Sequence, residues 1–357
     1  MRKSYLIQTE PLPRKARITI RAFLFPIFAE TFSLAKILII RFSSIGDLVL
    51  TTPIIRCVKQ QAENAEVHYI TKKQFAPVLE NNPHIDKLHT IEKSVSEVST
   101  ILRKENFDFV VDLHHNLRSA QVKSALRKPS QSFRKLNIEK WLMVNLRINK
   151  LPNLHIVDRY FETVKPLGVK NDGNGLDYFI PKNDEVDLKT LPAEFQNGYI
   201  GFVIGAKFFT KQMPAEKIIS ICKKINLPVV LLGGKEDYEK GEKILSSAGK
   251  NIFNACGKFN INQSASLVKQ AKKIITHDTG LMHIASAFKK EIISVWGNTI
   301  PEFGMFPYLP NTNSKILEVP NLSCRPCSKL GHSTCPKGHF RCMKEINEAE
   351  IISQIML

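Results

Sequence analysis

The sequence predicts an α/β protein of two tandem domains, each built around a parallel, doubly wound sheet. Apolar segments of strand length alternate with longer amphipathic segments along most of the 357 residues. The unbroken apolar run 37–40 is typical of a parallel strand that is buried on both faces. Repeated strand–helix units favour a parallel sheet, and a chain of this length has room for two cores.

Changes in composition divide the chain into domains. The stretch 182–197 is polar and acidic, follows Pro181 and contains Pro192, so we interpret it as the interdomain linker. The predicted parts are an N-terminal extension, a first Rossmann-like domain, a second Rossmann-like domain with a cysteine-rich tail, and a final helix; they span 1–35, 36–181, 198–343 and 344–357.

The first domain alternates strands and helices in the expected way. Its predicted strands are 37–40, 67–71, 84–90 and 107–113, and its predicted helices follow the loop 43–47 and cover 73–81, 94–105, 117–126 and 155–167. Glu97 follows Ser94 in the pattern of a capping box. Thr52 and Pro53 allow two interpretations, a helix start or a kink in a helix that began earlier.

The second domain repeats the pattern. Its predicted strands are 199–204, 228–232, 273–277 and 291–296, and its predicted helices are 214–225, 236–247, 262–271, 279–288 and 346–357. Several of these strands end in glycine or in an Asp-Thr-Gly step, where the backbone can come close to a ligand.

Asp47 is the one ionisable residue of the loop that follows the first strand. Open α/β sheets bind their ligands beside such loops, at the carboxyl edge of the strands. Taken alone, the more common role of an aspartate at this position is to cap the following helix.

The segment THDTGLMH, 276–283, carries the strongest chemical signal of the second domain. Thr279 and Gly280 stand where a strand turns into a helix, so their amides can bind a phosphate at the positive helix end. Lys207 and Lys211 follow another strand and bring cations to the same edge. The chain has neither a G-x-G-x-x-G after Ile40 nor a P-loop motif, which disfavours a dinucleotide oxidoreductase and a P-loop nucleotidase.

The composition indicates an anionic partner. There are 51 lysines and arginines against 33 acidic residues, a formal net charge of +18. The sequence lacks an aromatic-studded basic strand or a recognition-helix pattern, so we do not expect nucleic acid to be that partner. The apolar segment 18–34 is interrupted by charges and proline and resembles neither a secretory signal nor a spanning helix. It fits an interfacial helix or an extension packed on the first domain equally well, and we expect a cytoplasmic protein.

Taken as a set, these motifs resemble the ADP-heptose:lipopolysaccharide heptosyltransferase family, glycosyltransferase family 9. The family's first-loop pattern is matched from Ser44 through Asp47 to Pro53, and its Asp-Thr-Gly-x-x-His pattern by 278–283. The segments 108–119, 155–159, 205–211 and 233–234 also follow in the family's order. Two departures are Met213-Pro214, where the family usually has Trp-Pro, and residues 1–35, which match no part of it.

The resemblance implies a GT-B fold, two Rossmann-like domains facing across a cleft, and an inverting, metal-independent transfer that needs no cofactor. The donor implied is an ADP-sugar, and the acceptor is the lipid A/core oligosaccharide at the cytoplasmic face of the inner membrane. Asp47 is then the candidate base. The candidate donor-binding residues are Lys211, Glu236, Asp278, Thr279, Gly280 and His283. Asp237 competes with Glu236 for the ribose hydroxyls, and the chain has no Asp-x-Asp with which to hold a metal.

Arg118 is the candidate acceptor-binding residue. It follows the strand 107–113 after a short loop, so we expect it at the carboxyl edge, on the same side as Asp47. Arginine binds carboxylates and phosphates in a bidentate manner, and a core acceptor carries both. Lys123 and Arg127 are four residues apart and either extend this patch or form an ordinary solvated helix face.

The sequence does not decide the state of the tail cysteines or the position of the last helix. Four cysteines form the tail motif Cys324-x2-Cys327-x7-Cys335-x6-Cys342, for which zinc, reduced thiols and disulfides are all considered. The resemblance also allows the last helix to cross back to the first domain. The alternative function is a nucleotide-sugar epimerase or hydrolase on the same fold.

Overall fold

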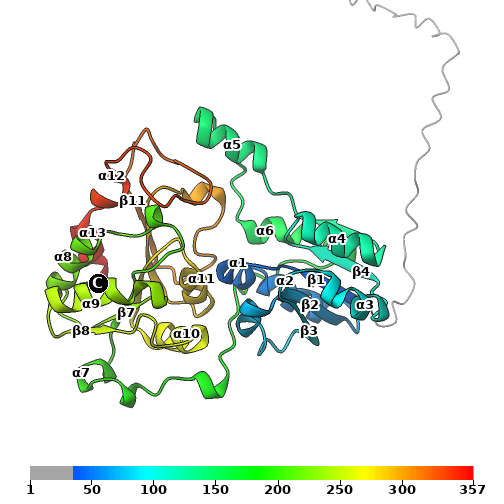
Figure 1. Cartoon of the computed structure of the whole chain (residues 1–357), viewed down its shortest axis with the longest axis horizontal. Coiled ribbons are helices and arrows are strands. Elements are labelled where there is room, and N and C mark those ends of the chain that lie inside the picture. Colours follow the sequence, from blue (N-terminus) through cyan, green and yellow to red (C-terminus); the bar gives the residue numbers. More distant parts are fainter. Residues whose placement is uncertain (1–34, 357) are drawn as a thin grey trace, which may run out of the picture. The chain divides into compact units, whose positions relative to one another are not determined.

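The computed structural model describes residues 35–356. The segment 18–34, for which we considered an interfacial or a packed position, lies outside the described residues. The described chain contains two separate parallel sheets joined by one connecting segment (Figure 1). The predicted α/β class with two Rossmann-like domains is confirmed.

The first sheet has the strand order β3-β2-β1-β4-β5, and every neighbouring pair is parallel. Its strands are β1 (Lys36–Ile40), β2 (Glu66–Lys72), β3 (Lys87–Ile91), β4 (Phe109–Asp112) and β5 (Ser130–Ser132). Ile37 pairs with Val67 on one side and with Phe109 on the other, so β1 is the central strand. Its four isoleucine and leucine side chains are fully buried, as the unbroken apolar run predicted.

The second sheet has the order β11-β10-β9-β6-β7-β8, again parallel throughout. Its strands are β6 (Ile200–Val203), β7 (Val229–Leu232), β8 (Ile252–Asn254), β9 (Lys273–His277), β10 (Glu291–Trp296) and β11 (Lys315–Glu318). Strands β5, β8 and β11 were not predicted. Each is short and lies at the edge of a sheet, where a strand needs less apolar sequence.

The helices of the first lobe are α1 (Ile45–Val49), α2 (Thr52–Gln61), α3 (Ser96–Lys104), α4 (Leu117–Leu126), α5 (Asn137–Leu146) and α6 (Ile156–Phe161). Helix α2 starts at Thr52 with Pro53 in its first turn, so the interpretation as a helix start is correct. The Glu97 carboxylate accepts the backbone N–H of Ser94, which is half of the expected capping box. Helix α5 was not predicted.

Two predicted helices of this lobe are shorter than expected because of proline. The segment 73–81 contains only a 3₁₀ helix, Lys73–Val78, with Pro77 inside it. Helix α6 ends at Phe161, and a separate 3₁₀ turn with Pro166 follows at Lys165–Leu167. Proline has no N–H to donate and its ring collides with the preceding turn, so an α-helix does not run through it.

Five helices of the second lobe agree with the predicted positions to within about two residues: α8 (Ala215–Lys224), α9 (Tyr238–Ala248), α10 (Ile261–Gln270), α11 (Gly280–Ala287) and α13 (Glu348–Met356). The short helix α12 (Arg341–Lys344) was not predicted. The final helix α13 packs on α8 of this same lobe: Glu348 accepts hydrogen bonds from Ser220 and Lys224, and Ile351 is fully buried. The described contacts therefore do not show the crossing back to the first domain that the resemblance allowed.

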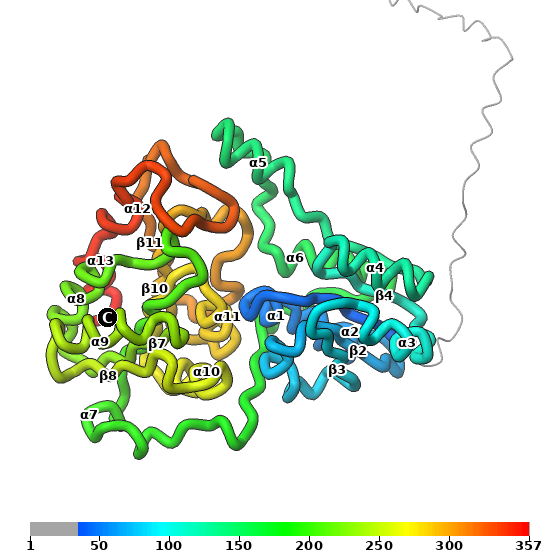
Figure 2. Tube along the Cα trace, in the orientation of Figure 1, coloured from blue at the N-terminus to red at the C-terminus, as the bar shows by residue number. Residues whose placement is uncertain are grey.

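The connecting segment 182–197 contains only short helical turns, among them α7 (Ala193–Gln196). Figure 2 follows it in green along the chain between α6 and α7. Its backbone is fastened to the second lobe, because Val186 N–H donates to the Ser266 hydroxyl and Asp184 accepts from the Asn262 amide.

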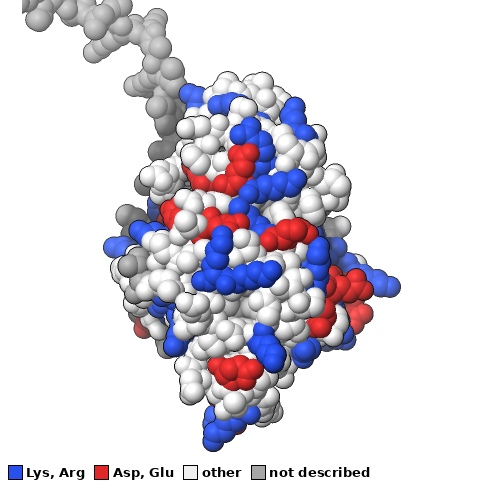
Figure 3. Space-filling view, turned by 90° about the vertical axis from the view of Figure 1, so that its left-hand side faces the viewer, with Lys and Arg blue, Asp and Glu red and all other residues white. Residues whose placement is uncertain are grey.

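Charge on the surface is mixed on the face that Figure 3 shows, where lysine and arginine side chains alternate with aspartate and glutamate. On this face the lysine and arginine side chains behind the formal charge of +18 do not form one continuous basic patch. Within residues 35–356, every helix is too short or too polar to cross a membrane.

Candidate functional site

Asp47 lies in the first turn of α1, directly after the central strand of the first sheet. Its Oδ1 is 2.6 Å from Arg41 Nη2. Its Oδ2 accepts the backbone N–H of Ser44 at 3.0 Å and the Ser44 hydroxyl at 2.8 Å. Asp47 therefore does stabilise the start of its helix, the more common role that the sequence suggested. Arg41 is a further partner, which the sequence analysis missed.

Arg41 is held where it is by several acceptors. It stands at the end of β1 and is almost completely buried. It donates to the carbonyls of Ser43 at 2.8 Å and Leu113 at 2.5 Å, and to the Tyr160 hydroxyl at 3.1 Å. The guanidinium is therefore fixed before any ligand arrives. The signal in the sequence was an arginine that directly follows the unbroken apolar run 37–40.

These contacts set the charge of Asp47. Burial by itself would raise the pKa of the Asp47 carboxyl, but the Arg41 charge and the two Ser44 hydrogen bonds outweigh burial and lower the pKa below its ordinary value. Asp47 is therefore ionised throughout the neutral pH range. An ionised carboxylate beside a sheet edge can accept a proton from a bound hydroxyl group.

A second pair of charges lies in the second lobe. Lys211 Nζ is 2.5 Å from Asp278 Oδ2, and the same oxygen accepts the Thr299 hydroxyl at 3.1 Å. Asp278 follows β9, and Thr279 is the N-cap residue of α11 with no side-chain hydrogen bond to the helix. The predicted residues Lys211, Asp278 and Thr279 thus meet at the positive end of α11.

Helix α1 of the first lobe and helix α11 of the second lobe are in direct contact, and glycine makes this possible. A Cβ on Gly46 would lie 2.7 Å from Cδ2 of His283, and a Cβ on Gly280 would lie 2.9 Å from Cγ2 of Ile45. Both distances are too short for carbon atoms. The two backbones approach this closely only because neither glycine has a side chain.

His283 lies at this contact and faces both groups of predicted residues. Burial lowers its pKa to about 4, whereas the carboxylates of Asp278 and Asp47 oppose the shift. His283 is therefore neutral at pH 7. Among residues 35–356 its Nδ1 has no hydrogen-bond partner. A ring nitrogen without a partner keeps its capacity to hydrogen-bond a ligand.

The loop after β7 distinguishes the two acidic candidates. Asp237 is buried and its carboxylate accepts the Gly234 N–H at 2.9 Å, so it stabilises the loop itself. Glu236 is exposed. Lys240, which the sequence analysis missed, donates to the carbonyls of Ile204 and Met213 at 3.1 and 3.0 Å. It therefore holds the loop after β6 in place.

Arg118 stands in the first turn of α4, at the carboxyl edge of the first sheet. Its guanidinium lies 5.6 Å from the ring centre of Phe42 and donates to the carbonyl of Lys93 at 3.2 Å. Phe42 belongs to the segment that leads from β1 to Asp47, so Arg118 is on the side of the sheet where the sequence placed it.

Of the two alternatives for this helix face, an extended patch or ordinary solvated side chains, the structure supports the second for Arg127, which is exposed, and neither for Lys123. Lys123 Nζ is 3.0 Å from Asp112 and 2.6 Å from the Ser132 hydroxyl, so it neutralises a fully buried carboxylate. Arg127 is the C-cap residue at the opposite end of the helix from Arg118. The i, i+4 spacing described the helix face correctly, but a buried acid on β4 had already engaged the lysine.

Another group of cations surrounds Lys140 of α5. Burial lowers the pKa of Lys140 to about 8. The charges of Arg159, Lys329 and Lys135 act in the same direction, and the Asp47 carboxylate opposes them. Lys140, on α5, is therefore within electrostatic reach of Arg159 on α6, of Lys135 and Lys329 in two loops, and of Asp47. Together they form a cationic region suited to an anionic ligand.

Two groups of residues were considered as metal ligands. The donor atoms of His68, His89 and Glu105 lie within 4.8 Å of one another. However, Lys36 and Lys87 both pair with Glu105, so its charge is already compensated. The tail cysteines are not in disulfides, and the Cys327 thiol donates to the carbonyl of Cys324 at 3.1 Å.

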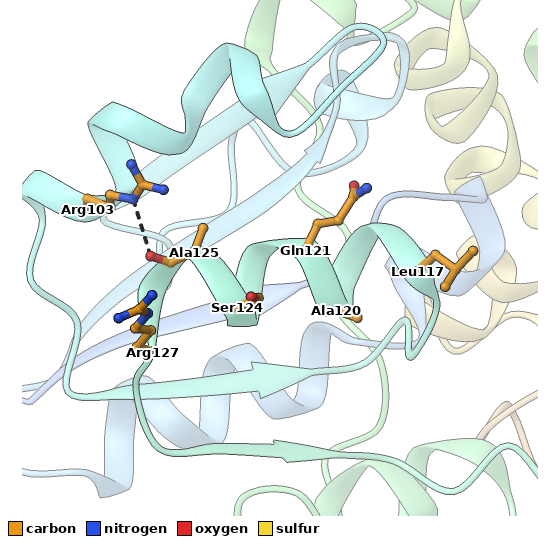
Figure 4. A pocket seen from close by; sticks show the side chains of 7 residues that line it. All are labelled: Arg103, Leu117, Ala120, Gln121, Ser124, Ala125 and Arg127. Carbon is orange, nitrogen blue, oxygen red and sulfur yellow. Dashed lines mark hydrogen bonds between the residues drawn. The ribbon is translucent and has the colours of Figure 1, made fainter.

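A shallow hollow of about 760 Å³ lies elsewhere, along the outer face of α4. Figure 4 shows Arg103 and Arg127 at one end and Leu117 at the other, with an Arg103 hydrogen bond to the Ala125 carbonyl. Its remaining lining is small and uncharged. We assign it no part in the site around Asp47.

The chain is similar to known proteins in both sequence and structure. The sequence profile of glycosyltransferase family 9 (heptosyltransferase) matches residues 96–337, more than half of the chain. A lipopolysaccharide heptosyltransferase 1 from Campylobacter coli is 25% identical over 292 residues, 74% of this chain and 84% of that protein.

Two solved structures share the fold. A family 9 glycosyltransferase from Veillonella parvula aligns with a TM-score of 0.72 and 22% identity, over 92% of this chain and 98% of its own. An ADP-heptose LPS heptosyltransferase II from E. coli aligns with a TM-score of 0.68 and 20% identity, over 90% of this chain and 97% of its own. Both confirm the GT-B arrangement of two Rossmann-like domains.

The glycine contact between α1 and α11 leads to a prediction whose sign is informative. In an ordinary helix, replacing glycine by alanine stabilises the protein by about 0.5–1 kcal/mol. Because a Cβ here would lie 2.7 Å from His283, we expect Gly46→Ala to destabilise it by about 1–3 kcal/mol. Urea unfolding followed by circular dichroism measures the difference. A more stable variant would contradict the close contact.

Proposed function

Because the chain belongs to glycosyltransferase family 9 and is a glycosyltransferase, we propose that it transfers heptose from ADP-heptose to a hydroxyl group of a lipopolysaccharide core or lipid A acceptor, with inversion and without a metal ion. The supporting observation is that the α1–α11 contact brings an ionised aspartate and a helix-end phosphate site into one region.

In this proposal Asp47 is the base. The acceptor hydroxyl loses its proton to Asp47 while its oxygen attacks the anomeric carbon, and the bond from that carbon to the diphosphate oxygen breaks on the opposite face. The lowered pKa makes Asp47 a weak base, so the proton moves late, as the leaving diphosphate departs and the hydroxyl becomes acidic. Arg41 holds the carboxylate in place for this step.

The leaving diphosphate gains negative charge that must be stabilised. Lys211 and the backbone amides of Thr279 and Gly280 would supply this stabilisation at the N-terminus of α11. Asp278 pairs with Lys211 and keeps the lysine oriented. We infer that these groups act where other transferases use a divalent cation. His283 would donate to or accept from the same ligand through its free Nδ1.

The nucleoside and the acceptor would occupy different lobes. Glu236, exposed beside the β7 loop, is the group we assign to the ribose hydroxyls, since Asp237 is already engaged. Arg118 and the cationic region of Lys140 and Lys329 would receive the phosphates and carboxylates of the acceptor. An acceptor with a lipid anchor would place the enzyme at the cytoplasmic face of the inner membrane, as a peripheral protein.

The function is tested by incubating the protein with ADP-heptose and a heptose-deficient lipopolysaccharide core. We expect mass spectrometry to show the acceptor gaining one heptose, at the same rate with excess EDTA. Release of free heptose, or an epimerised nucleotide sugar, would instead indicate the hydrolase or epimerase alternative. A rate that depended on added Mg²⁺ or Mn²⁺ would contradict metal independence.

Replacing the proposed base separates chemistry from binding. Asp47→Asn removes the proton acceptor but keeps the size of the side chain, so we expect transfer to fall by about 100-fold or more. ADP affinity, measured by calorimetry, should stay the same because the donor site is on the other lobe. A variant with more than a few per cent of wild-type kcat would show that Asp47 is not the base.

Lys211 and Lys207 provide a matched pair for the diphosphate site. Both are in the loop after β6, but Lys207 is exposed and lies over the ring of Phe208. Lys211→Met should weaken ADP binding by about tenfold, more strongly at low salt, whereas Lys207→Met should have little effect. Thr279→Val should also weaken binding. Equal effects of the two lysine variants would show that the diphosphate does not bind at this edge.

Arg118 and Arg127 offer the same comparison on the acceptor side, because they occupy opposite ends of α4. Arg118→Ala should raise the acceptor KM, or lower kcat/KM, by at least about tenfold, a loss of about 1.4 kcal/mol. Arg127→Ala should leave both unchanged, and neither variant should alter ADP affinity. Steady-state kinetics with varied acceptor at fixed donor decides between them; an unaltered Arg118→Ala enzyme would reduce that arginine to a solvated side chain.

A further inference from the structure

Helix α5, Asn137–Leu146, has no buried side chain although its sequence is largely apolar. The exposed fractions are 74% for Ile138, 56% for Trp141 and 53% for Leu146, and Ile148 just beyond the helix is 44% exposed. Figure 1 shows α5 standing apart from α4 and α6 of its own lobe. A soluble surface rarely presents several large apolar side chains together without a partner.

The charges around this helix indicate what kind of partner fits. Five cations accompany it in the sequence; they are Arg134, Lys135, Lys140, Arg147 and Lys150. The one nearby acid, Glu139, is engaged by Arg134. If a second copy of the chain packed on α5, the cations of one copy would lie against those of the other and repel them. The other four cations form no ion pair with an acid among the described residues. Apolar side chains next to such cations instead match an anionic lipid surface, where headgroups bind lysine and arginine and the interface accepts tryptophan.

The position of α5 relative to the proposed active site is also relevant. Lys140, on the same helix, lies 5.6 Å from the ring centre of Phe303 and within the electrostatic reach of Asp47. Arg147, at the end of the helix, donates to the carbonyls of Cys324 and Pro326 in the second lobe. Lys140 and Arg147 therefore attach α5 beside the proposed acceptor region, while its apolar side chains stay exposed.

We propose that α5 and Ile148 dock the protein on an anionic phospholipid bilayer, with Ile138, Trp141 and Leu146 entering the interface between headgroups and acyl chains. This proposal rests on the proposed function, because an acceptor that carries lipid A has to be bound at a membrane. It adds the element that makes this contact. The apolar side chains enter the lipid and the adjoining cations bind the headgroups, so the acceptor sugar would arrive on the side of Lys140.

The two tryptophans of the chain make a direct test available. Trp141 is exposed, whereas Trp296 is 1% exposed and inside the second sheet. On adding vesicles of phosphatidylcholine with phosphatidylglycerol to the full-length protein, we expect the tryptophan emission to shift to the blue and brominated lipid to quench it. Vesicles of phosphatidylcholine alone should bind at least about tenfold more weakly.

Three variants identify the segment responsible. Trp141→Phe should still sediment with anionic vesicles but lose the spectral shift. The double variant Ile138→Ser/Leu146→Ser should bind at least about tenfold more weakly and keep its melting temperature, since neither side chain is buried. The control Ile101→Ser/Ile316→Ser removes two comparably exposed apolar side chains from α3 and β11, and it should bind like the wild type.

Several outcomes would overturn the proposal. Equal vesicle binding by the double variant and the control would assign any membrane contact to another part of the chain. A blue shift without vesicles that grows with protein concentration would indicate self-association through α5. Transfer to an acceptor stripped of its acyl chains provides the separation from the proposed function: if that reaction proceeds but α5 does not bind vesicles, this inference fails and the enzymatic function stands.

Discussion

Two helices from different lobes touch through glycine, and the arrangement of the site depends on that contact. Gly46 and Gly280 each leave room for a neighbouring residue of the other helix, so α1 and α11 pack with their backbones close together. Both helices begin at the carboxyl edge of a parallel sheet, where the strand-to-helix loops carry the polar residues. Packing these two helix starts together places the loop of each sheet beside the other.

The charges at this contact are paired before a ligand binds. Asp47 is held by Arg41, and Lys211 is held by Asp278, each within hydrogen-bonding distance. In the proposed reaction, the diphosphate would compete with Asp278 for Lys211. In return the side chains are already oriented, which is the property that electrostatic stabilisation of a transition state requires. The neutral His283 lies between the two pairs and adds no charge that would upset them.

The surplus of positive charge is distributed in a way that the net charge alone does not reveal. Some lysines compensate buried acids, as Lys123 does for Asp112. Others, such as Lys140 and Lys329, remain close together near Asp47. In the proposed function this second group adds positive potential on the acceptor side, and it adjoins the exposed apolar helix α5. The net charge therefore overstates the free positive charge of this protein, because some lysines are matched with acids.

The sequence by itself determined the fold class, most strand positions and the residues of the two motifs. Periodicity and the buried run 37–40 depend on local chemistry, which is why β1, β9 and β10 were predicted almost to the residue. The pairing of Arg41 with Asp47, the engagement of Lys123 by Asp112 and the packing of α13 on α8 were decided only by the tertiary structure. Each joins side chains or elements through packing that no local pattern records. The exposure of α5 belongs with them, because an apolar helix is buried or exposed according to what the rest of the chain leaves beside it.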